Sequence, residues 1–128
     1  MKRGFTLVEI LIVMTLIGIL AAIIVPRHKT AIIRAKEAVL KENLYQIRDG
    51  VNMYYFDKKV YPTSLEDLVG KYLSKIPIDP FTEKAEWELV HFEPEETEDF
   101  DPDIAEGIID VKSLSQKIGL DGTKYSEW

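Results

Sequence analysis

The chain has 128 residues, a formal net charge of −6 and no cysteine. The length suits one small domain with an extension. The negative charge argues against a general nucleic-acid binder, which needs a basic face, and the lack of cysteine excludes a disulfide framework.

The first predicted element is an apolar helix near the N-terminus. Residues 7–25 are all apolar except Glu9, Thr15 and Gly18, and about 20 such residues cross the hydrocarbon core of a bilayer. Lys2 and Arg3 precede this run, so a simple signal anchor is one interpretation. Glu9 favours another, because a carboxylate inside a spanning helix costs a few kcal/mol and usually marks function.

The stretch Gly4-Phe5-Thr6-Leu7-Val8-Glu9, followed by the apolar run, resembles the class III signal of type IV pilins and type II secretion pseudopilins. The resemblance implies that residues 1–4 are a leader and that a prepilin peptidase cuts between Gly4 and Phe5. It also implies N-methylation of the new Phe5 amine. The apolar helix is then retained as a single span of the bacterial inner membrane, with the C-terminal head in the periplasm.

The same resemblance suggests a role for Glu9. In a helical filament of identical subunits, its carboxylate would meet the Phe5 ammonium of a neighbouring copy and set the register between them. Further partners implied by the family are minor pseudopilins and an inner-membrane assembly platform. The charges do not decide the orientation, because Lys2 and Arg3 on one flank are matched by Arg27 and Lys29 on the other.

Beyond the span, apolar residues recur mostly every three or four positions: Ile33, Leu40, Leu44, Ile47, Val51 and Tyr54. This spacing predicts one long helix over about residues 5–56, and the chain is divided into a transmembrane helix (5–25) and an amphipathic helix (26–60). Pro26 lies between the two parts and predicts a kink or a locally melted stretch, because proline removes one backbone hydrogen bond.

Residues 61–128 are expected to form a small head. A short helix is predicted at 64–68, where Thr63 and Ser64 begin two overlapping capping patterns. Strands are predicted at 87–92 and 108–111, with a weaker third strand near Tyr125. The predicted fold class is α+β and pilin-like: a long N-terminal helix packed on a small antiparallel sheet. The order Tyr61-Pro62-Thr63 followed by Ile76-Pro77-x-Asp79-Pro80 also resembles the pseudopilin head.

A calcium site is a further expectation from the resemblance, since major pseudopilins bind calcium in a C-terminal loop. The ligands carried over are Asp110, Ser113 and Asp121, with backbone carbonyls from Leu114 or Gln116. Calcium takes six to eight oxygen ligands. The alternative is that Asp121 and Gly122 simply form a turn.

Other candidate features are weaker. Residues 93–103 hold seven acids and are interpreted as a solvated loop, with a second cation site or a partner surface as alternatives. His28 adjoins a basic cluster suited to lipid headgroups, and His91 lies in a predicted strand. These two histidines give enzyme chemistry little to use, so no enzyme is expected.

The predicted function is therefore that of a structural subunit of a type II secretion pseudopilus, which polymerises to promote protein export across the outer membrane. The alternatives are a type IV pilin forming a surface fibre for adhesion or motility, and a membrane-anchored binding module that never polymerises.

Overall fold

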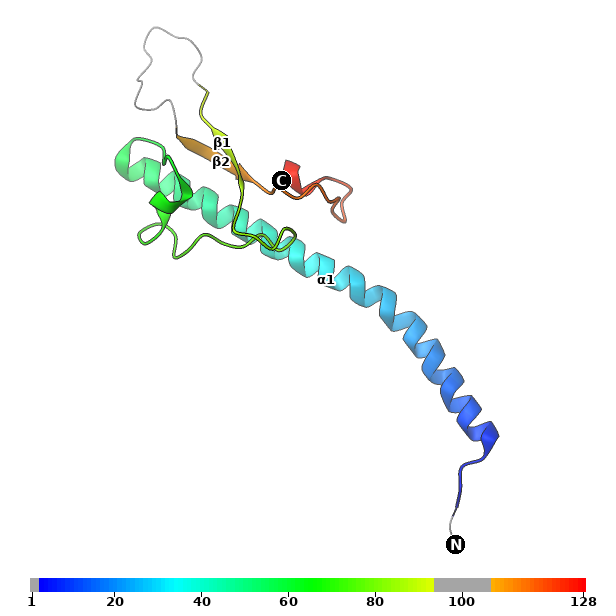
Figure 1. Cartoon of the computed structure of the whole chain (residues 1–128). Helices are drawn as coiled ribbons and strands as arrows, with labels where there is room; N and C mark the ends of the chain where they lie inside the picture. The colour runs from blue at the N-terminus through cyan, green and yellow to red at the C-terminus, as the bar shows by residue number, and fades with distance from the viewer. Residues whose placement is uncertain (1–2, 94–106) are drawn as a thin grey trace. The chain divides into compact units, whose positions relative to one another are not determined.

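The structure is a computed structural model that describes residues 3–93 and 107–128. Its elements, in chain order, are α1 (Leu7–Lys58), η1 (Leu65–Leu68), β1 (Glu88–His91), β2 (Ile108–Lys112) and η3 (Tyr125–Glu127), where η marks a short 3-10 helix (Figure 1). The chain divides into two compact units, Met1–Ala35 and Lys36–Trp128.

The N-terminal unit contains the first part of α1. The helix begins after Thr6, whose hydroxyl accepts a hydrogen bond from the Glu9 backbone N–H at 3.2 Å, and this contact satisfies one of the free donors of the first turn. The apolar side chains of this part are exposed. The segment is long and apolar enough to cross a membrane, and no part of its most apolar stretch is buried. A surface this apolar needs lipid or protein around it.

Pro26 does not interrupt α1, which is helical on both sides of it. The structure therefore excludes the locally melted stretch, and the kink stays a prediction. One missing N–H removes a single hydrogen bond from the ladder, and the helix continues with the bonds of the neighbouring turns.

The C-terminal unit is built around the second part of α1. Leu40, Leu44, Ile47 and Val51 are buried along one face of the helix, as the spacing predicted. They belong to one core cluster with side chains from the rest of the head: Leu65, Leu68, Leu73, Trp87, Ile108, Val111 and Tyr125. The amphipathic part of α1 is thus the support on which the head folds.

The sheet of the head has two antiparallel strands, β1 and β2, with Glu88 opposite Lys112 and Val90 opposite Asp110. Both strands lie within a residue or two of their predicted positions. The predicted third strand near Tyr125 is wrong. Residues 125–127 form η3 instead, and only an isolated bridge between Ile118 and Lys124 precedes it.

Candidate functional site

Phe5 lies just before α1, and Glu9 lies in the first turn of that helix. Together with Ile10, Val13 and Met14 they line a hollow of about 230 Å³. Phe5 is 80% exposed. The Glu9 carboxylate thus lies on the surface among exposed apolar side chains.

The predicted cleavage position lies just before α1. Gly4 and Phe5 are exposed and outside the helix, and a Cβ added to Gly4 would meet no atom within 4 Å. The peptide bond between Gly4 and Phe5 is thus exposed and precedes the first residue of α1.

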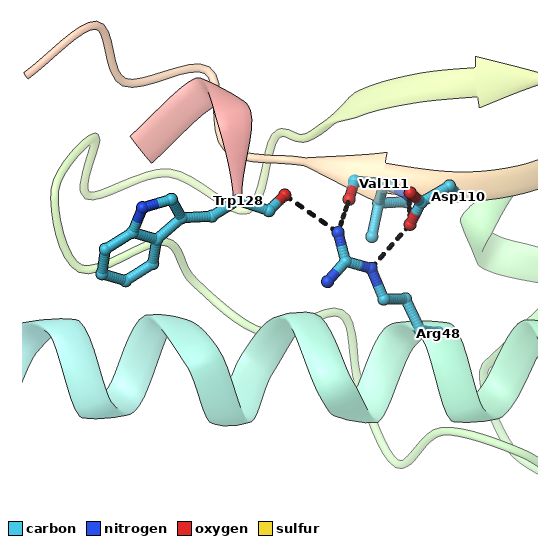
Figure 2. Close-up of polar contacts among 4 residues, drawn as sticks. All are labelled: Arg48, Asp110, Val111 and Trp128. Carbon is cyan, nitrogen blue, oxygen red and sulfur yellow. Dashed lines mark hydrogen bonds and ion pairs between the residues drawn. The ribbon is translucent and has the colours of Figure 1, made fainter. Parts of the chain in front are cut away.

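The three residues predicted as calcium ligands have separate partners. The Asp110 carboxylate accepts a hydrogen bond from Arg48 Nε at 2.6 Å (Figure 2). Ser113 is buried, and its hydroxyl donates to the Asp79 carboxylate. Asp121 Oδ1 accepts from the backbone N–H and the hydroxyl of Thr123, at 2.9 and 2.7 Å.

These contacts do not fit a shared calcium site. The Arg48 guanidinium pairs with Asp110 Oδ1, and the Ser113 hydroxyl donates to the Asp79 carboxylate. Within residues 3–93 and 107–128, no group of three or more His, Asp or Glu side chains is arranged to hold a metal ion. Calcium binding stays a prediction, and in this structure Asp110, Ser113 and Asp121 each have a hydrogen-bond partner within the chain.

Two charged residues of α1 were missed by the sequence analysis. Glu37 accepts hydrogen bonds from the Leu120 backbone N–H at 2.7 Å and from the Tyr125 hydroxyl at 2.9 Å. Arg48 reaches Asp110 and two backbone carbonyls. The available signal was that both residues flank the apolar stripe of the helix, but the sequence does not tell which distant segment they meet.

The remaining candidates lie elsewhere. Most of the acidic run, residues 94–103, falls outside the described residues, so its role stays a prediction. His28 is exposed on the N-terminal unit. His91 ends β1, as its placement in a predicted strand required.

Comparisons with known proteins agree with the fold and with the N-terminal motif described above. A family model described as the prokaryotic N-terminal methylation motif matches residues 1–25. The type II secretion system core protein G of Pseudomonas aeruginosa is 37% identical over 97 residues, which cover 62% of this chain and 68% of that protein. The Escherichia coli protein of the same name is 30% identical over 97 residues, covering 62% and 67%.

A fimbrial protein, EcpC of Eikenella corrodens, is 31% identical over 83 residues, but these cover only 54% of that protein. No solved structure matches the chain. The N-terminal motif, the long helix with its small two-stranded head, and the extent of the match to core protein G lead to one conclusion. The chain belongs to the type II secretion system core protein G family, the family of the major pseudopilins.

Proposed function

We propose that this major pseudopilin loses residues 1–4 and then polymerises through a contact between Glu9 of one copy and the Phe5 amine of the next. The observation that carries the proposal is the exposed hollow that Phe5, just before α1, lines together with Glu9 in the first turn of the helix. Cleavage would place a cation at Phe5, since an α-amine is protonated at neutral pH.

The strength of this ion pair depends on the medium around it. Among packed apolar helices, a carboxylate and an ammonium attract each other far more strongly than on a wet surface. Removing one partner leaves the other charge unpaired, which costs about 3–5 kcal/mol for a buried pair. The contact therefore favours a single stagger between neighbouring copies, and many weak helix contacts become one defined filament.

The same proposal implies a cellular location for the protein. The apolar helix anchors the protein in a membrane. We place the N-terminus in the cytoplasm, where a prepilin peptidase and an assembly platform would act on it, and the head in the periplasm. Minor pseudopilins are the proposed partners at the filament end. Relatives of this kind are structural subunits rather than enzymes, so energy for assembly would come from a separate ATPase.

The test is Glu9→Ala in cells that make the secretion system. We expect the variant to enter the membrane normally and to lose pseudopilus assembly, because the Phe5 ammonium has no partner. Thr15→Ala is the matched control: it removes a polar group from the same apolar run, where the hydroxyl donates to the Leu11 carbonyl of its own helix at 2.7 Å. Filaments of normal length with Glu9→Ala would overturn the proposal and favour a binding module that never polymerises.

A surface pilus is the second candidate, and the match to a fimbrial protein favours it. Immunolabelling separates the two functions. Antibody against the head should reach the filament only after the outer membrane is opened if the filament is a pseudopilus, whereas labelling of intact cells would indicate a surface fibre.

A further inference from the structure

One face of α1 receives the C-terminal residues 113–128 through charged side chains. Glu37, Lys41 and Arg48 follow each other at intervals of four and seven, so they lie along one stripe of the helix. Each of them contacts the C-terminal residues. Glu37 and Arg48 do so by hydrogen bonds, and Lys41 Nζ lies 4.5 Å from the centroid of the Trp128 ring. Buried Leu44 lies between Lys41 and Arg48.

At the first contact, Glu37 holds the turn before η3. One carboxylate oxygen accepts from both Leu120 and Tyr125. The approach is close enough that a Cβ on Gly119 would lie 3.0 Å from Glu37 Oε1 and 3.0 Å from the Tyr125 ring. The turn itself is closed by the Gly119 N–H bonded to the Thr123 carbonyl at 2.7 Å.

At the other contact, Arg48 joins β2 to the last described residue. Figure 2 shows its guanidinium between the strand and Trp128. Nε donates to Asp110 at 2.6 Å, and Nη2 donates to the Val111 carbonyl at 3.0 Å and to the main-chain oxygen of Trp128 at 2.9 Å. A planar guanidinium suits this task because its donors have a fixed geometry, which a lysine lacks.

We propose that Glu37 and Arg48 hold the C-terminal residues of this pseudopilin on α1 directly, in the role that the family resemblance gives to calcium. The carboxylate of Asp110 is paired with Arg48, and that of Asp121 is turned to its own loop. The head then folds without a divalent cation. This inference concerns the head alone and does not depend on the Glu9 contact.

Chelation is the first test, done on the full chain in detergent micelles. The melting temperature of the head, followed by fluorescence of its tryptophans, should be the same in excess EDTA and in excess calcium chloride. A melting temperature that falls in EDTA and recovers with calcium would overturn the proposal.

Asp121→Asn sharpens this test. Asparagine keeps an oxygen that accepts from Thr123 but removes the charge that calcium needs. We expect the variant to melt like the parent protein in both buffers. If calcium holds the loop, the variant will instead melt lower and lose its response to the chelator.

The direct contacts are tested by Glu37→Ala and Arg48→Met. Loss of hydrogen bonds to a charged group should lower the melting temperature by on the order of 5–10 °C. Trypsin should then cut faster after Lys117 and Lys124, within the released segment. Glu42→Ala is the matched control, since Glu42 is an exposed acid of the same helix and accepts a hydrogen bond from Gln46 in the next turn. Unchanged melting and unchanged cleavage in both variants would contradict the proposal.

Discussion

Tyr125 makes both polar and apolar contacts in the head. Its ring is 1% exposed and stacks on Phe81, and its hydroxyl donates to Glu37. Burial, with the Glu37 carboxylate adding to it, raises the pKa of the Tyr125 phenol from 10.0 to about 12. The neutral phenol's contribution to stability is therefore fully present below pH 10 and is lost as the pH rises toward 12.

This pKa can be measured by the ultraviolet absorbance of tyrosinate. The chain has six tyrosines, and we expect one of them to ionise near pH 12 with the parent fold still present at the start of that step. Tyr125→Phe should remove this late step. A late step that survives the substitution would show that another tyrosine is responsible and that the Glu37 contact is not formed in solution.

At the scale of elements, the helix and the two strands could be predicted because their patterns are local. Apolar residues repeat at helical spacing, and such a pattern predicts that one face of the helix is buried. The structure buries that face at Leu40, Leu44, Ile47 and Val51. The turn at Asp79 is also local, since its carboxylate accepts from the backbone N–H groups of Phe81 and Thr82.

The C-terminal residues could not be predicted in the same way. Tyr125 has the composition of a strand residue, but no neighbouring strand offers it a continuous ladder, and its ring is buried by Phe81 and Trp128 instead. The partners of Glu37 lie more than 80 residues away in sequence. Such contacts depend on the path of the whole chain, which a local pattern does not contain.

The importance of α1 to the head gives a prediction for this element. Ile47 is fully buried in the core, so Ile47→Ala should reduce the free energy of unfolding by about 2–5 kcal/mol through lost burial and the cavity left behind. Chemical denaturation of the full chain in micelles, followed by tryptophan fluorescence, measures this. Gln46→Ala, next to it on the exposed side, should change the free energy by less than about 0.5 kcal/mol. Equal losses in both variants would contradict the burial of this face.

At the scale of the whole molecule, the two units of the chain have surfaces that suit different surroundings. The first unit exposes apolar side chains along α1 and suits lipid or packed helices, whereas the second buries its apolar side chains in a core of its own. These two surfaces suit a protein that is anchored in a membrane by its first unit. The family membership and the apolar helix make the anchoring plain, and the side on which the head lies can be measured.

Because the chain has no cysteine, single cysteines can report its orientation without background labelling. Ser74→Cys lies on an exposed turn of the head and should react with a membrane-impermeant maleimide in spheroplasts, whose inner membrane is intact. Arg3→Cys, in cells that lack the prepilin peptidase and so keep the leader, should react only after that membrane is permeabilised. The reverse pattern would place the head in the cytoplasm, where a pseudopilus cannot form, and the proposed function would then be wrong even if Glu9→Ala behaves as expected.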